Sequence, residues 1–187
     1  FPFAVGSADA ALLTTLQPGV YTVQIGGGTG VVLAEIYEVP DANEAPGARR
    51  LVNTSTRGLV APEFPLIAGF VIGGTAPQRV LVRATGPALA GAPFNVPGVL
   101  ANPQVAIYRG STVVRTNDDW FRDPEAALIR DAASRVRAFA LGNQSLDAAV
   151  LTFLEPGAYT AVVRGPANAP AANSTGIALV EIYESNP

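Results

Sequence analysis

The densest group of side chains that could do chemistry is the run NDDW at 117–120, with Asp123 and Glu125 following it. Carboxylates at this density can coordinate calcium, which takes about six to eight oxygen ligands. The match to an EF-hand loop is poor, because the run lacks a glycine at the sharp turn and a glutamate at the twelfth position. Asp118, Asp119 and Asp123 are therefore candidate calcium ligands. In the alternative interpretation, Asp118 or Asp119 closes a turn after a strand while Asp123 caps a helix.

Trp120 is the single tryptophan of the chain, and Phe121 follows it directly. Exposed aromatic rings of this kind can form a platform for a sugar ring. A large rigid ring also buries much apolar area, and that favours a place in the core. A glycan contact and a buried ring are thus the two hypotheses for Trp120.

Several residue types are absent, and their absence excludes whole classes of chemistry. The chain has no histidine, cysteine, methionine or lysine, so all 12 basic residues are arginine. A histidine base, a thiol nucleophile, a zinc site of the usual ligands and a disulfide framework are excluded. The Ser and Thr residues lie in no nucleophile motif. We therefore predict a protein that is not an enzyme and needs no cofactor, with calcium as the one open alternative.

Charge and hydropathy argue against nucleic acid as a partner and against a membrane span. The formal net charge is −3, with 15 acidic residues, so clustered cations for binding nucleic acid are missing. No stretch approaches the roughly 18 uninterrupted apolar residues that a membrane span requires. The chain begins without a signal peptide, so for a secreted protein we expect the mature form or a fragment.

The two ends of the chain repeat each other. The segment DAALLTTLQPGVYTVQI at 9–25 returns as DAAVLTFLEPGAYTAVV at 147–163, and TGVVLAEIYE at 29–38 returns as TGIALVEIYE at 175–184. The first blocks are 138 residues apart and the second 146, so the later copy holds eight additional residues in a loop rich in Gly, Pro, Ala and Asn. A period near 140 residues is that of a domain.

The repeat predicts the domain organisation. Residues 1–38 are the final third of a preceding repeat, with strands expected at 10–16, 20–25 and 30–38. Residues 39–48 are expected to be a linker and 49–187 a complete repeat. Three strands of this size bury little core, so the first segment needs a partner surface.

Period-2 alternation within the complete repeat predicts short strands. We expect them at 49–55, 66–73, 79–86, 103–109, 111–117, 148–154, 158–164 and 176–184. One short helix is predicted near 124–137, because Asp123 followed by Pro124 is a typical helix start. The fold class is therefore all-β: an antiparallel, jelly-roll-like β-sandwich with one helix.

Glu35 and Glu181 lie at matching places in otherwise apolar strands. A solvated strand face is one explanation. Pairing with a strand arginine such as Arg83 or Arg115 is the other.

Two resemblances add to this interpretation. The strings LVNTSTRGLV, LIAGFVIGG, RVLVRATGPAL, NDDW, LEPGAYTAVVRG and GIALVEIYE resemble a repeated C-terminal module of large secreted proteins of environmental bacteria. More distantly, NDDW followed by PGAYTAVVRG is similar to the bacterial pre-peptidase C-terminal domain, a jelly-roll-like sandwich. The resemblance implies secretion and binding or assembly, and it supplies no catalytic residue.

The expected function is a non-enzymatic extracellular assembly module of a bacterial cell surface, a subunit or repeat of a polymer or fibre held by strand pairing. Its partners are copies of itself or neighbouring repeats, and residues Leu13, Tyr21, Leu33 and Ile36 carry the contact. In the competing arrangement residues 1–38 fold back onto their own chain. The alternative function is a carbohydrate-binding accessory module of a secreted enzyme, with polysaccharide as partner.

Overall fold

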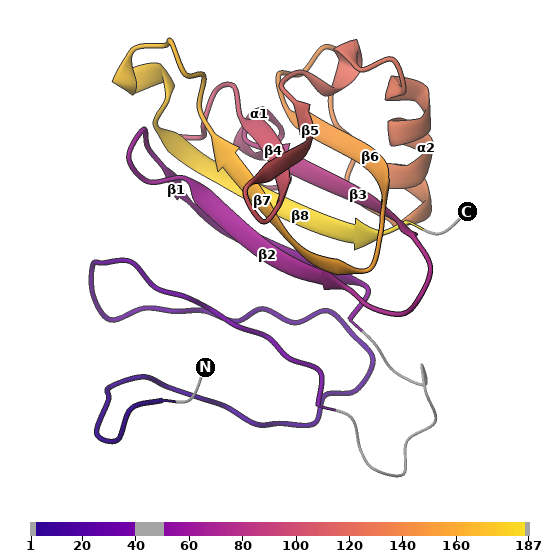
Figure 1. Ribbon diagram of the computed structural model, residues 1–187. Helices are drawn as coiled ribbons and strands as arrows, with labels where there is room; N and C mark the ends of the chain where they lie inside the picture. The colour runs from indigo at the N-terminus through magenta and orange to yellow at the C-terminus, as the bar shows by residue number, and fades with distance from the viewer. Residues whose placement is uncertain (1–2, 40–50, 186–187) are drawn as a thin grey trace. The chain divides into compact units, whose positions relative to one another are not determined.

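A computed structural model describes residues 3–39 and 51–185. Residues 51–185 form two antiparallel sheets of four strands (Figure 1). One sheet has the order β1 (Asn53–Val60), β8 (Gly176–Glu184), β3 (Gln78–Thr85), β6 (Ala148–Leu154). The other has the order β2 (Leu66–Ile72), β7 (Gly157–Arg164), β4 (Gln104–Arg109), β5 (Thr112–Asn117). Apart from the β4–β5 hairpin, successive strands lie in opposite sheets, which is a jelly-roll arrangement and confirms the predicted fold class.

The main core lies between the sheets and follows the alternation of the sequence. Val80, Val82 and Ala84 of β3 are buried in it, as predicted from their period of two. Tyr159, Ala161 and Val163 of β7 face them from the other sheet. The packing of these two inner faces stabilises the sandwich by removing apolar area from water.

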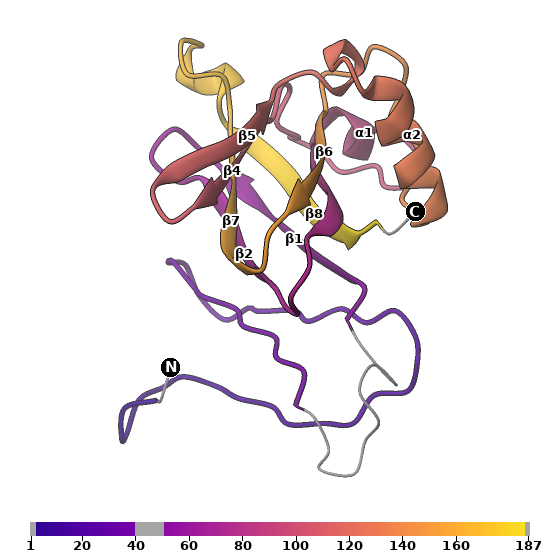
Figure 2. The same ribbon diagram turned by 45° about the vertical axis from the view of Figure 1, so that its right-hand side comes forward.

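A second apolar cluster covers the outer face of the β1-β8-β3-β6 sheet. The helix α2 (Ala126–Arg135) packs there beside β6, as Figure 2 shows. Ile129 and Ala132 of α2 meet Leu81 of β3 and Leu151 of β6. Both faces of β3 are thereby buried, and this explains why its residues are inaccessible on the arginine side as well as the valine side.

The remaining helical elements are short. They are α1 (Pro87–Ala90) and the 3-10 turns η1 (Trp120–Arg122) and η2 (Ala171–Asn173). No helix in residues 3–39 or 51–185 is long and apolar enough to cross a membrane.

Two predicted boundaries are corrected. β1 begins at Asn53 rather than residue 49, because its ladder with β8 runs from Asn53 opposite Tyr183 to Val60 opposite Gly176. The helix begins at Ala126 rather than 124. Asp123 closes a turn ahead of it, with Ala126 N–H donating to the Asp123 carbonyl at 3.0 Å, so Asp123 is not the residue directly before the helix.

Gly176 starts β8 where the backbone of Leu100 passes close to it. A Cβ atom at Gly176 would lie 2.6 Å from Leu100 Cα, closer than any real side chain approaches. We expect Gly176→Ala to lower the free energy of unfolding by at least about 2 kcal/mol, since backbone must move to admit the methyl group. Urea denaturation measures this. Gly69→Ala is the matched control, because the nearest atom there is 4.0 Å away, and equal losses in both variants would contradict the prediction.

Residues 3–39 form a separate unit in which the predicted strands at 10–16, 20–25 and 30–38 are not assigned. The segment is exposed throughout, and neither sheet includes any of it. The predicted linker at 39–48 lies outside the described residues apart from Val39. The correction has a physical reason: a β-strand is defined by its hydrogen-bonded neighbour, and residues 3–39 form no strand ladder among themselves.

Candidate functional site

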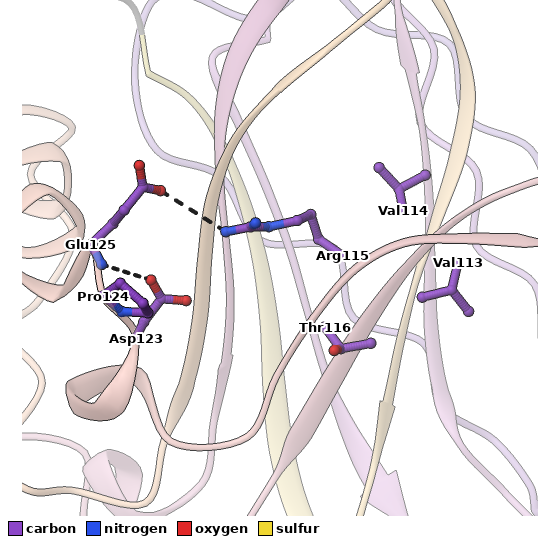
Figure 3. Close-up of a pocket in the computed structure, with 7 residues that line it drawn as sticks. All are labelled: Val113, Val114, Arg115, Thr116, Asp123, Pro124 and Glu125. Carbon is purple, nitrogen blue, oxygen red and sulfur yellow. Dashed lines mark hydrogen bonds and ion pairs between the residues drawn. The ribbon is translucent and has the colours of Figure 1, made fainter.

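The run at 117–125 connects β5 to α2 and forms turns rather than a cation cage. Asn117 closes the strand, and its Oδ1 accepts from Ala149 N–H at 2.9 Å. Asp119 Oδ2 pairs with Arg122 Nε at 3.0 Å. Asp123 Oδ1 accepts from Glu125 N–H at 2.8 Å, as Figure 3 shows. In the part of the chain that the structure describes, no three acidic side chains gather around one point.

One carboxylate oxygen of this region, Asp119 Oδ1, is buried without a hydrogen-bond partner among the described residues. A single oxygen falls far short of the ligands that calcium needs. Asp118 faces elsewhere: with its amide nitrogen turned toward Asp118, Asn102 donates to Oδ1 at 3.1 Å. The local geometry therefore favours the turn interpretation of the three aspartates.

We expect the melting temperature of the protein to be the same in excess calcium chloride and in excess EDTA. The reason is that Asp118, Asp119 and Asp123 each already hold a partner within the protein. Differential scanning calorimetry checks this. A rise of several degrees with calcium, lost in Asp119→Asn, would restore the calcium hypothesis.

Trp120 is only 2% exposed, and its ring belongs to the cluster beneath α2. Its backbone N–H donates to the carbonyl of Asp147 at 2.9 Å, which fixes the turn to β6. Arg130 lies over the ring, with its guanidinium carbon 5.3 Å from the ring centroid. The core interpretation fits this ring, and the glycan contact at Trp120 does not, because the ring has no free face.

A hollow of about 580 Å³ lies between β5 and the start of α2 (Figure 3). Its lining combines Val113 and Val114 with the pair Arg115 and Glu125, whose charged atoms are 3.9 Å apart. Both charged side chains are about half exposed, so the pair contributes little to stability. Thr116 and Asp123 also line the hollow, and the Asp123 carboxylate is held by the backbone N–H of Glu125.

The most constrained polar group is the buried pair of Arg83 on β3 and Glu181 on β8. These residues face each other in the ladder, and Arg83 Nε and Nη2 donate to Glu181 Oε2 at 2.9 and 2.5 Å. Arg83 Nη1 also donates to the carbonyl of Phe139 at 2.6 Å. Pairing with Arg83 is thus the correct alternative for Glu181, and Arg115 pairs with Glu125 instead.

Tyr183 completes this group by donating from its hydroxyl to Glu181 Oε1 at 2.6 Å. Burial, together with the hydrogen bond and negative charge of Glu181, raises the pKa of Tyr183 above its ordinary value. The phenol therefore stays protonated as a donor. These hydrogen bonds hold the side chains of Arg83, Glu181 and Tyr183 in one buried network.

Asp147, at the entrance to β6, is the second buried anion, and the sequence did not single it out for this role. Its side chain is fully buried and accepts from the backbone N–H groups of Gly86 at 2.8 Å and Ala88 at 3.2 Å, and from the Ser145 hydroxyl. The carboxylate thereby ties β6 to the turn that follows β3. The signal that could have found it is its exact recurrence as Asp9.

The local bonds of the complete repeat recur in residues 3–39. Tyr159 donates to the carbonyl of Glu155 at 2.8 Å, and Tyr21 donates to that of Gln17, at the same spacing, at 2.7 Å. Tyr37 likewise donates to Glu35 Oε1 at 2.7 Å, as Tyr183 does to Glu181. The segment thus keeps the local turn and strand-end geometry of β6–β8.

The predicted assembly residues Leu13, Tyr21, Leu33 and Ile36 are all exposed. Three of their counterparts are buried: Leu151, Tyr159 and Ile182 are 4%, 4% and 9% exposed, against 84%, 53% and 56% for Leu13, Tyr21 and Ile36. The structure brings none of the four into a packed core. Within their own unit, residues 3–39, they form an apolar set that is not packed into a core.

The chain was compared with protein families, curated proteins and solved structures. No family model and no curated protein matches the chain. Among solved structures, the pre-peptidase C-terminal domain of a collagenase from Bacillus anthracis matches at 10% identity, with a TM-score of 0.38, over 70% of this chain and 89% of that domain. It is the type of domain that the NDDW and PGAYTAVVRG motifs resemble.

Proposed function

We propose that this chain is a non-enzymatic structural repeat of an extracellular bacterial polymer, in which neighbouring repeats are joined by β-strand pairing. The observation that supports this is the duplication at the ends of the chain. Residues 3–39 carry the sequence of β6–β8 and expose the apolar side chains that those strands bury. A group of exposed apolar side chains of this kind is typical of a surface that associates with a partner.

The polar groups support the same conclusion. Arg83, Glu181 and Asp147 are the ionisable side chains that are buried most deeply, and each is held by structural hydrogen bonds. Neither the hollow beside β5 nor these groups place a nucleophile, a base and an oxyanion donor together. We infer from these structural bonds that the chain acts through its shape and its contacts with other repeats.

The alternative, a carbohydrate-binding accessory module, depended on Trp120. Because that ring is buried, Trp120→Ala would empty part of a core and would not report on glycan contact. A glycan array probed with the unmodified protein is the proper test, and tight, specific binding there would favour the alternative.

The proposed function is tested by locating the protein in the cells that make it. An antibody against the sandwich is used on fractionated cells, and the labelled fraction is separated under native conditions. We expect the signal at the surface or in the medium, in particles much larger than one 187-residue chain. A monomer-sized species inside the cell, or turnover of a peptide or glycan by the purified protein, would contradict the proposal.

A further inference from the structure

The strands β6, β7 and β8 never pair with one another. In the complete sandwich β6 pairs with β3, β7 lies between β2 and β4, and β8 lies between β1 and β3. All hydrogen-bonded neighbours of the last three strands therefore belong to the first five. A second set of final strands, such as residues 3–39, has no neighbour until a second set of first strands is supplied.

A folded second copy of residues 1–187 does not supply a free set of first strands, because the numbers of first and final strands do not match. Residues 1–187 contain the sequence of the final strands twice, at 9–38 and at 147–184, and one set of first strands, within 53–117. If residues 3–39 of one molecule entered the sandwich of another, they would displace β6–β8 there. The exchange would expose as much apolar surface as it buried, so copies of residues 1–187 alone leave one set in each copy unpaired.

Three residues within 3–39 indicate which groups the missing partner must provide. Glu35 matches Glu181, whose carboxylate is buried against Arg83. Asp9 matches Asp147, which accepts from two backbone N–H groups of the turn after β3. Gly30 matches Gly176. A Cβ at Gly176 would strike Leu100, whereas at Gly30 it would meet nothing within 4 Å.

Within residues 3–39 these residues lack the partners that their counterparts have. Glu35 stands in an otherwise apolar run and accepts from the Tyr37 hydroxyl, and Gly30, at φ +155°, has open space where Gly176 meets Leu100. In a sandwich each of them is required by a neighbour. Their joint presence indicates a buried destination whose geometry is that of β1–β5.

We propose that residues 3–39 complete a second jelly-roll sandwich on a partner of defined chemistry: a five-stranded unit of the β1–β5 type that lacks its own final strands. The partner places an arginine opposite Glu35, two turn N–H groups against Asp9, and a backbone segment against Gly30. This inference rests on the proposed function and names the partner through which strand pairing operates. The completed sandwich has the strand order of residues 51–185.

The test uses an extended chain that contains a second copy of β1–β5 ahead of residues 3–39. A copy of residues 51–138 is placed directly before Phe1, so that residue 1 follows where residue 139 would, in the register of the repeat. Amide hydrogen exchange is then compared with that of the original chain. We expect the amides of 20–25 and 31–37 to exchange at least about 100-fold more slowly in the extended chain, which stays monomeric.

Variants of the extended chain identify the contacts. Glu35→Gln and Gly30→Ala each reverse the protection of 20–25 and 31–37, while that of β7 and β8 is unchanged. Gly26→Ala is the matched control and retains protection, because the matching residue in the complete repeat is Arg164, where a side chain is accommodated.

Two results would overturn the inference. If 20–25 and 31–37 exchange as fast in the extended chain as in the original, β1–β5 is not their partner. If these amides become protected in the original chain at high concentration, a folded second copy suffices. The second result leaves the proposed function standing, and fractionation of the cells tests that function separately.

Discussion

Glu181→Ala lowers the free energy of unfolding of the sandwich by about 3–5 kcal/mol, because it leaves the fully buried guanidinium of Arg83 without its counter-ion. Urea denaturation followed by tryptophan fluorescence measures the change, since Trp120 lies in the adjoining cluster. The double replacement Arg83→Met with Glu181→Leu should recover much of the loss, because no charge then remains buried.

Glu35→Ala is the matched control for that variant. Glu35 stands at the same place in the same motif and keeps the same tyrosine bond, but it is exposed. We expect a change within about 0.5 kcal/mol in the isolated chain. A large loss for Glu35→Ala, or a negligible one for Glu181→Ala, would contradict the assignment of the buried pair.

Asp147→Ala is expected to cost about 3 kcal/mol, since the N–H groups of Gly86 and Ala88 would lose a charged acceptor while remaining shielded from water. Thermal and urea unfolding of the purified variant measure the loss. Asp9→Ala removes the matching carboxylate from the exposed segment and should leave the unfolding curve unchanged. Equal effects in the two variants would mean that Asp9 already has a buried partner.

Much of the sandwich could be predicted because its determinants are local. The alternation in β3 and β7 follows directly from the two-residue period of a strand, and Gly and Pro mark the turns between strands. The internal repeat was also visible in the sequence, since matched blocks at 9–25 and 147–163 need no structure to be recognised.

The rest depended on contacts between distant residues. Arg83 was one of two arginines that could pair with Glu181, and only the register of β3 against β8 decides between them. The burial of Trp120 depends on α2 folding over the outer face of a sheet. The strands expected within 3–39 need hydrogen-bonded neighbours, and their own composition does not provide them.

The central claim is that residues 3–39 carry the sequence of the final strands of a second sandwich and do not pair with the first strands within 51–117. Amide hydrogen exchange of the unmodified protein at low concentration tests it most directly, with each amide of 20–25 and 31–37 compared with its counterpart in β7 and β8. The account predicts slow exchange in β7 and β8 and exchange near the rate of an unstructured peptide in 20–25 and 31–37. Equal protection of the two sets in a monomer would contradict it, because the first segment would then be paired within its own chain.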